Sequence, residues 1–274
     1  MKNKDPYFTE FIEPTEHFAL PNQLTDPFST APHPLCKLAS SQLQNYLKEQ
    51  TEWEHNFGFL LSPSDYAKQS IQNKPIIGKM FGVLLVTDKE SKLGFLSAFS
   101  GKLAGGNRHS RFVPPVFDGL SKGSFVNIGM TALTDIINEI KALENRAVKT
   151  TDDESKAELR NAIAELKKAR KIHSIDLQEK IFRRYIFLNQ RGAKKSLHDI
   201  FLDFANQKPP SGAGECTAPK LLQYSFAHKM KPLAIAEFWW GQSPKSVNWK
   251  HKHYYPACQE KCAPILDFML DGLI

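Results

Sequence analysis

The sequence predicts an α+β fold, in which an antiparallel sheet with packed helices is interrupted by a protruding antiparallel two-helix arm. Residues 78–103, GKMFGVLLVTDKESKLGFLSAFSGKL, contain two apolar runs around the polar turn DKESK, a pattern typical of a β-hairpin. Residues 124–206 change to charged sequence with apolar residues at helical spacing. We therefore expect an α+β body, residues 1–123 and 205–274, and a helical hairpin arm, residues 124–204.

The first part of the body is expected to contain little regular structure. Residues 1–35 are rich in Pro, Phe and Thr and predict an extended segment whose phenylalanines pack onto the body. A helix is predicted over residues 35–50, where Leu38, Leu43 and Leu47 have roughly helical spacing. Beyond the hairpin, the pair of prolines in FVPPVFD argues against a central strand or helix.

The arm is predicted from two narrow apolar stripes. The first comprises Leu133, Ile136, Ile137, Ile140 and Leu143, and the second Leu159, Ile163, Leu166, Leu177 and Ile181. The polar stretch KTTDDES separates them, and Thr151 with Glu154 forms a capping box for the second helix. Two helices joined by a short turn predict an antiparallel hairpin, and narrow stripes favour an exposed pair over a buried bundle.

The last part of the body is predicted as helix, strand, turn and strand. The segment TAPKLLQYSFAHKM is helical, with Pro219 tolerated in the first turn. The run PLAIAEFWW is a strand by its aromatic and branched content, GQSPKS is a turn, and HKHYYPAC is a second strand that ends near Pro256.

Composition restricts the class of protein. With 41% hydrophobic and 24% charged residues, the 274-residue chain has the balance of an ordinary soluble globular protein. Its net charge of +7 favours a polyanionic partner, with RNA ahead of a membrane. Four cysteines are too few for a disulfide framework in a chain of this size. The first residues lack the apolar region of a signal peptide, and no apolar run approaches the length of a membrane span, so a cytoplasmic protein without a membrane partner is expected.

Cys216, in the stretch SGAGEC before a predicted helix, is a candidate nucleophile. The free N–H groups of a helix start stabilise a thiolate. A Cys at a helix start followed by a strand carrying His253 is the chain order of transglutaminase-like and papain-like cysteine enzymes, in which a third polar residue, here Glu237 or Asp267, orients the His. A hydrolase or amidase using Cys216, His253 and Glu237 is one interpretation. The alternative is a small structural residue at a crowded turn.

The same cysteine belongs to a candidate zinc set. Cys216, Cys258, Cys262 and His251 are the residue types of a structural zinc site, which would make the chain a zinc-stabilised interaction module. The C-x3-C spacing is less specific than C-x2-C, and thiols that are only buried remain the alternative.

Two sets of residues suit RNA. The arm has an excess of cations that can contact phosphates, namely Lys167, Lys168, Arg170, Lys171, Arg183 and Arg184. In the block FWWGQSPKS, Trp239 and Trp240 are suited to stack on unpaired bases, with Lys245 on phosphate. Core packing in a strand is the alternative for the two rings.

Several blocks together resemble a known family. GKMFGVLLV, LGFLSAFSGKL, FVPPVFD, PPSGAGECTAPKLLQYSF, AEFWWGQSPKS and HYYPACQEKCAPIL resemble, in this order, the amino-terminal region of a large subgroup of RluA-like RNA pseudouridine synthases. The resemblance spans residues 81–270. In that subgroup the region precedes the synthase domain, whose catalytic Asp lies in an HRLDxxTSG-like motif that this chain lacks. The resemblance implies an accessory region, inactive alone and without a cofactor, that assists the synthase domain of its parent protein in binding rRNA or tRNA.

Overall fold

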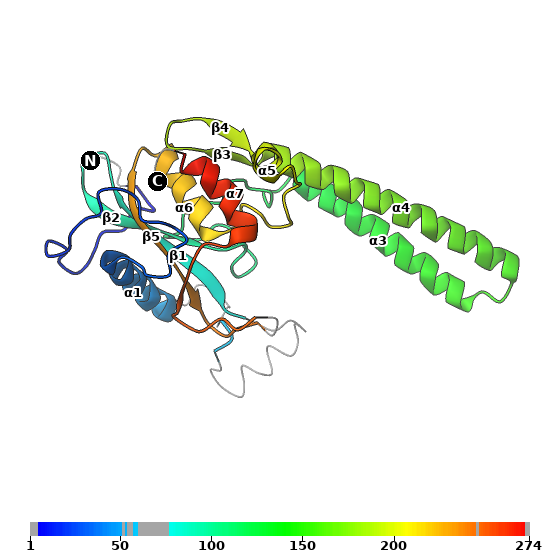
Figure 1. Ribbon diagram of the computed structural model, residues 1–274. Helices are drawn as coiled ribbons and strands as arrows, with labels where there is room; N and C mark the ends of the chain where they lie inside the picture. Colours follow the sequence, from blue (N-terminus) through cyan, green and yellow to red (C-terminus); the bar gives the residue numbers. More distant parts are fainter. Residues whose placement is uncertain (1–4, 51–52, 54–56, 60–76, 245–246, 272–274) are drawn as a thin grey trace. The chain divides into compact units, whose positions relative to one another are not determined.

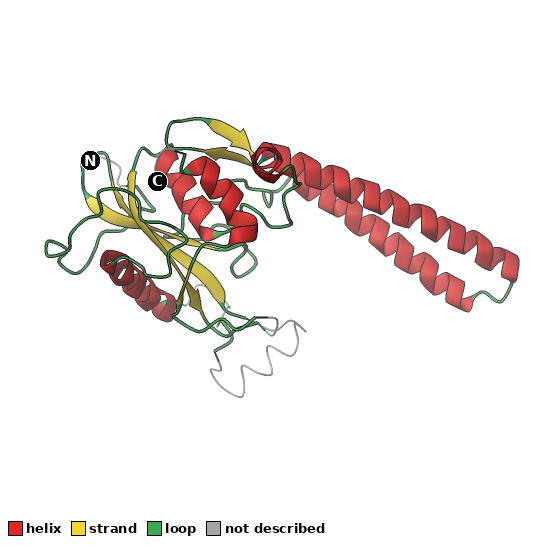
Figure 2. Cartoon of the chain, in the orientation of Figure 1, coloured by secondary structure: helices red, strands yellow, loops and turns green. Residues whose placement is uncertain are grey.

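The chain forms two compact units in a computed structural model that describes residues 5–50, 53, 57–59, 77–244 and 247–271. One unit comprises Met1–Val116 with Ile186–Ile274, and the other comprises Phe117–Tyr185. The first unit contains an antiparallel sheet with packed helices and the second a helix pair, so the predicted α+β class is confirmed (Figure 2). Residues 186–204, which the sequence analysis assigned to the arm, lie in the first unit.

The main sheet has four strands in the order β2-β1-β5-β6, and every neighbouring pair is antiparallel. Strands β1 (Lys79–Thr87) and β2 (Leu93–Phe99) form the predicted hairpin. Strand β5 (Lys231–Trp240) pairs with β1 along its length. The predicted last strand is reduced to β6 (Tyr254–Tyr255), since only these residues pair with β5.

Helices cover both faces of this sheet (Figure 1). Side chains alternate along a strand, so Phe81 and Phe238 point into the core beneath α1 (Pro34–Glu49). On the opposite face, Gly82 of β1 lies under the start of α6 (Thr217–Ala227). Burial on both faces explains why β1 and β5 have near-continuous apolar sequences.

The amino-terminal segment packs onto this body, as expected from its phenylalanines. Thr9 exchanges two backbone hydrogen bonds of 2.9 Å with Phe95 of β2, and Phe8 is buried. The Phe11 ring lies 5.3 Å from that of Phe95. Farther along, the Thr25 N–H donates to the Leu233 carbonyl at 3.1 Å. The segment is thus fixed at both outer strands of the three-stranded part of the sheet.

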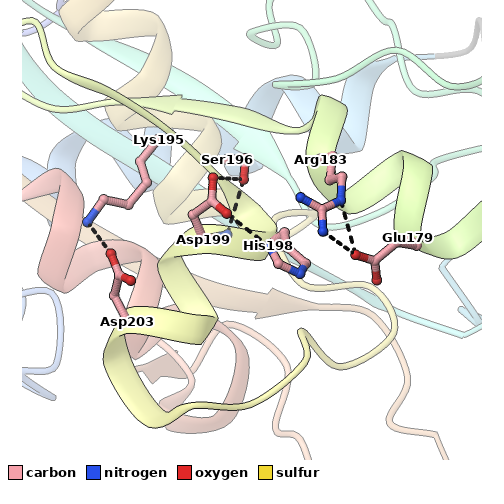
Figure 3. Close-up of polar contacts among 7 residues, drawn as sticks. All are labelled: Glu179, Arg183, Lys195, Ser196, His198, Asp199 and Asp203. Carbon is pink, nitrogen blue, oxygen red and sulfur yellow. Dashed lines mark hydrogen bonds and ion pairs between the residues drawn. The ribbon is translucent and has the colours of Figure 1, made fainter.

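Four further elements complete the first unit. They are β3 (Ile186–Leu188), β4 (Lys194–Ser196), α5 (Leu197–Ala205) and α7 (Gln259–Met269). Helix α7 and strand β3 pack against α6, α5 packs against α7, and β4 pairs with β3. The α5 start is capped by the Ser196 hydroxyl, which accepts from the Asp199 N–H at 3.1 Å, while Lys195 and Asp203 form an ion pair at 2.9 Å (Figure 3).

The sequence analysis made no prediction for the residues of α7, a helix that contains Pro264. Its residues Ile265, Leu266 and Met269 are fully buried. The burial of three large apolar side chains is worth several kcal/mol, which offsets the hydrogen bond that the proline cannot donate.

The second unit contains α3 (Phe125–Lys149) and α4 (Asp153–Arg184), the antiparallel pair that the two stripes predicted. Gly129 permits close contact between them: a Cβ placed there would lie 2.7 Å from a methyl carbon of Leu177. The predicted capping box of Thr151 and Glu154 is wrong by one residue. Asp152 caps α4 instead, because its carboxylate accepts from the Ser155 N–H at 2.8 Å.

Among the helices within the described residues, none combines the length and apolar character that crossing a membrane requires.

Gly82 provides the first testable prediction. A Cβ at this position would lie 2.8 Å from Thr217 Cβ and 2.9 Å from its Oγ1, at the fixed start of α6. Gly82→Ala should therefore reduce the free energy of unfolding by roughly 1–3 kcal/mol, measured by urea denaturation. Gly106→Ala is the control, since the nearest atom to its Cβ, His109 Nε2, is 3.4 Å away. Equal effects of the two substitutions would contradict the steric argument.

Candidate functional site

Three cysteines that are distant in sequence meet at one place in the first unit. The Sγ atoms of Cys216, Cys258 and Cys262 all lie within 4.8 Å of one another, and those of Cys258 and Cys262 are 3.4 Å apart. All three are free thiols. We refer to them as the cysteine cluster. The fourth cysteine, Cys36, lies on α1 and is buried in the core that this helix covers.

Two helix starts bring the cluster together. Cys216 is the N-cap residue of α6 and Cys258 is the N-cap residue of α7, and neither side chain makes a capping hydrogen bond. Cys262 lies one turn into α7, where the spacing i, i+4 places it on the same face as Cys258. The sequence analysis correctly placed Cys216 at a helix start, but it had no basis for the second helix.

The cap of α6 comes from the sheet. Glu237 of β5 is buried, and its Oε1 accepts hydrogen bonds from the Thr217 hydroxyl and, at 2.9 Å, from the Ala218 N–H. Burial raises the pKa of Glu237 to about 7, against the two hydrogen bonds that lower it. Glu237 is therefore occupied in holding the first turn of α6 and is not oriented toward a histidine.

The thiols in the cluster govern one another's protonation. The hydrogen bond with Cys258 and burial raise the pKa of Cys216. Hydrogen bonds with Cys216 and Cys262, together with the N–H group of Lys261, lower the pKa of Cys258. Cys262 has a raised pKa because of its hydrogen bonds with the other two thiols. Negative charge therefore develops first on Cys258, the most exposed of the three.

Lys220, which the sequence analysis overlooked, places a buried cation close to Cys216. Its Nζ donates to the carbonyls of Phe99 at 3.1 Å and Gly101 at 3.4 Å, and it lies 3.4 Å from the Glu215 carboxylate. Burial lowers the pKa of Lys220, while the charges of Glu215 and Cys216 raise it. A Lys within the apolar run of TAPKLLQYSF was the signal available in the sequence.

The two candidate histidines are not part of this cluster. His251 Nδ1 accepts from the Gly241 N–H at 3.0 Å, and its ring packs 4.5 Å from that of Trp240, which belongs to the core beneath α1. The His253 carbonyl accepts from the Trp239 N–H, and its side chain is exposed. Among the described residues, the only group of three or more metal-binding side chains is the cysteine cluster.

The predicted catalytic set of Cys216, His253 and Glu237 is therefore not assembled. The reason is topological: Cys216 faces the side of the sheet covered by α6, whereas the strand expected to carry His253 shortens to two residues and leaves the ring in solvent. The pKa of Cys216 is also raised, which is the opposite of nucleophile activation.

The two tryptophans proposed to stack on RNA bases are inside the protein. Trp239 and Trp240 are 7% and 2% exposed. Trp239 Nε1 donates to the Gly241 carbonyl at 3.2 Å, and its ring stacks on Trp249. Core packing, the alternative interpretation, accounts for both rings. Lys245 lies outside the described residues.

The arm cations differ in how far they are neutralised. Lys167 pairs with Glu144 of α3 at 2.8 Å, and Arg183 pairs with Glu179 at 2.9 Å (Figure 3). Arg184 lies over the Phe125 ring at 5.7 Å. The remaining members of the predicted set are exposed and have no ion pair or hydrogen bond within the described part of the chain, namely Lys168, Arg170 and Lys171. We call these three residues the α4 cation patch.

Comparisons of the chain with protein-family models, with curated proteins and with solved structures find no match. The function proposed below therefore depends on the chain's own residues and on the sequence resemblance described above.

Glu237 provides a prediction on pH. Its folded-state pKa of about 7, against an ordinary 4.5, means that the folded protein favours the protonated carboxyl. The stabilisation from this group is complete below about pH 4.5 and is lost as the pH rises through about 7. Glu237→Gln keeps the acceptor and removes the charge. In urea unfolding followed against pH, the variant should gain stability relative to the natural chain from about pH 5 to about pH 8, by at most on the order of 3 kcal/mol.

Glu237→Ala is the matched control for this experiment. It removes the acceptor for Thr217 and Ala218, so it should be less stable than Glu237→Gln at every pH, by roughly 1–3 kcal/mol. A Glu237→Gln variant whose stability follows that of the natural chain at all pH values would show that the carboxyl does not titrate in this range.

Proposed function

We propose that the chain is the amino-terminal accessory region of an RNA pseudouridine synthase, and that it helps the synthase domain bind structured RNA, either ribosomal or transfer RNA. The ordered sequence blocks that resemble this family support the assignment to the enzyme class. The observation that carries the RNA-binding role is the α4 cation patch.

The patch concentrates positive charge over a short length of helix. The sequence KKARK, residues 167–171, has four cations in five residues and no acidic residue, and only Lys167 is neutralised by a neighbour. Five helical residues cover about 6 Å along the axis. Exposed cations at this density attract a polyanion, and arginine and lysine are the usual ligands of backbone phosphates.

Contacts to phosphates would increase the affinity for RNA but would give little specificity for its base sequence. Phosphate contacts position a protein on RNA but do not identify bases, which require exposed aromatic or hydrogen-bonding groups on a base-reading surface. The two tryptophans that were candidates for that role are buried. The accessory region would therefore hold the RNA, and the synthase domain would select the uridine.

The proposal predicts a specific salt dependence. Replacing Lys168, Arg170 and Lys171 together with Gln should weaken binding to a fragment of ribosomal RNA, because three phosphate contacts are lost. The slope of log K against log salt should decrease in magnitude by about 2 to 3, measured by fluorescence anisotropy.

The control variant also loses three positive charges, but it loses them from the first unit. Lys37, Lys89 and Lys229 are exposed, and their replacement by Gln should leave the slope close to that of the natural chain. If both triple variants reduce the slope equally, binding depends on net charge alone and the α4 cation patch is not the contact surface.

The family assignment predicts that this chain alone does not form pseudouridine, because none of its residues matches the family's catalytic Asp motif. Unmodified ribosomal RNA incubated with the chain should show only background when pseudouridines are mapped, whereas a complete synthase of the family serves as the positive control. Turnover by this chain would mean that it contains an active site of its own, and the accessory role would be wrong.

A further inference from the structure

The spacing of the cysteine cluster suits a shared metal ion. Zinc–sulfur bonds of about 2.3 Å in a tetrahedron place two bound sulfurs about 3.8 Å apart. In the cluster one pair of Sγ atoms is 3.4 Å apart, and all three lie within 4.8 Å of one another. The tetrahedral value lies between the 3.4 Å distance and the 4.8 Å upper limit, and the 3.4 Å separation exceeds the roughly 2.05 Å of a disulfide. Small rotations of the side chains would bring the three sulfurs to equal distances from one ion.

Two positive groups near the cluster stabilise thiolates, against the burial that raises the pKa of Cys216 and Cys262. The starts of α6 and α7 both lie at the cluster, so the positive ends of the two helix dipoles lie near the sulfurs. The buried ammonium of Lys220 adds a full charge near Cys216. Together these groups offset the negative charge that three thiolates retain when they bind a divalent cation.

We propose that Cys216, Cys258 and Cys262 form a zinc site with three thiolate ligands and a fourth position filled by solvent. Three soft sulfur donors select zinc over the oxygen-preferring magnesium and calcium ions. On binding, each thiol releases its proton to solvent and its sulfur forms a bond to the ion.

Among the described residues, no carboxylate or imidazole lies close enough to the three sulfurs to join the group. Glu237 Oε1 already accepts hydrogen bonds from Thr217 and Ala218. The His251 ring packs against Trp240 on the opposite side of the sheet and accepts from Gly241. Cys258 is exposed, so the ion and a solvent ligand can reach the cluster from its side. The ligand set is thus narrower than the sequence suggested.

The proposed site would join two helices that the chain connects only through β5 and β6. Cys216 lies on α6 and the other two thiols on α7 and its cap. Because the complete site exists only in the folded state, zinc binding would add to the free energy of unfolding. This inference is independent of RNA binding by the α4 cation patch.

The test uses the full chain under reducing conditions. We expect about one equivalent of zinc per chain by elemental analysis, and a higher melting temperature with zinc than after chelation. Cobalt titration of the chelated protein should give a thiolate-to-cobalt charge-transfer band and the visible bands of tetrahedral geometry. Cys258→Ser changes an exposed residue and should lower zinc affinity at least tenfold, with circular dichroism as the check on folding.

Two variants serve as controls. Cys36→Ala removes a thiol from the core beneath α1, and His251→Asn removes the imidazole, and both should bind zinc as the natural chain does. Absence of zinc and of the cobalt bands would overturn the proposal, as would unchanged affinity in folded Cys258→Ser. Loss of binding in folded His251→Asn would overturn the three-thiolate ligand set.

Discussion

The first unit depends on one buried contact, between the Glu237 carboxylate and the start of α6. A helix start leaves N–H groups without partners, and a carboxyl group buried in a sheet lacks water. Each satisfies the other here, because Glu237 accepts from Thr217 and Ala218. The contact is possible only because Gly82, the β1 residue paired with Glu237, has no side chain. The position of α6 over the sheet follows from these residues.

The cysteine cluster follows from the same contact. Since Glu237 caps α6, the N-cap residue has no capping role, and Cys216 can direct its thiol to α7. Helix N-caps are usually Ser, Thr, Asp or Asn, and losing such a cap costs about 1 kcal/mol. Both α6 and α7 have Cys at this position without a capping bond. Glu237 compensates for the missing cap only at α6, and the proposed shared ion would account for a cysteine at both helix starts.

Local patterns allowed much of the fold to be predicted. The β1–β2 hairpin, α1, the helix pair of the second unit and the helix start at Cys216 each depend on periodicity or turn chemistry within a few dozen residues. Helix α7 was missed, since its local sequence includes Pro264 and the burial that stabilises it comes from distant elements.

The candidate site was less predictable, because it depends on which face of each strand is covered by a helix. An aromatic run such as FWW has the same sequence whether it stacks on bases or lies beneath a helix, and only the packing of α1 and its neighbours shows that Trp240 is core. The grouping of Cys216 with Cys258 was likewise set by the packing of α6 against α7. The residue types of the proposed zinc site were visible in the sequence, but the packing of His251 against Trp240 was not.

Salt also affects the helix pair of the second unit. Its α4 helix buries only Ile163, Leu177 and Phe182 among its described residues, and it is accompanied by exposed ion pairs such as Lys167 with Glu144 and Lys180 with Asp176. Salt weakens these pairs as it weakens contacts to phosphate.

The effect of salt on the stability of the helix pair is smaller than its expected effect on RNA affinity. An exposed ion pair contributes roughly 0 to 1 kcal/mol, so screening the pairs of α4 changes the stability of the helix pair by at most a few kcal/mol. Each phosphate contact, by contrast, contributes nearly one full unit to the slope of log affinity against log salt. Under the proposed function, salt should therefore release RNA from the α4 cation patch while the helical signal of the free protein changes little. A helical signal that disappears over the same salt range would instead place the salt sensitivity in the folding of the arm.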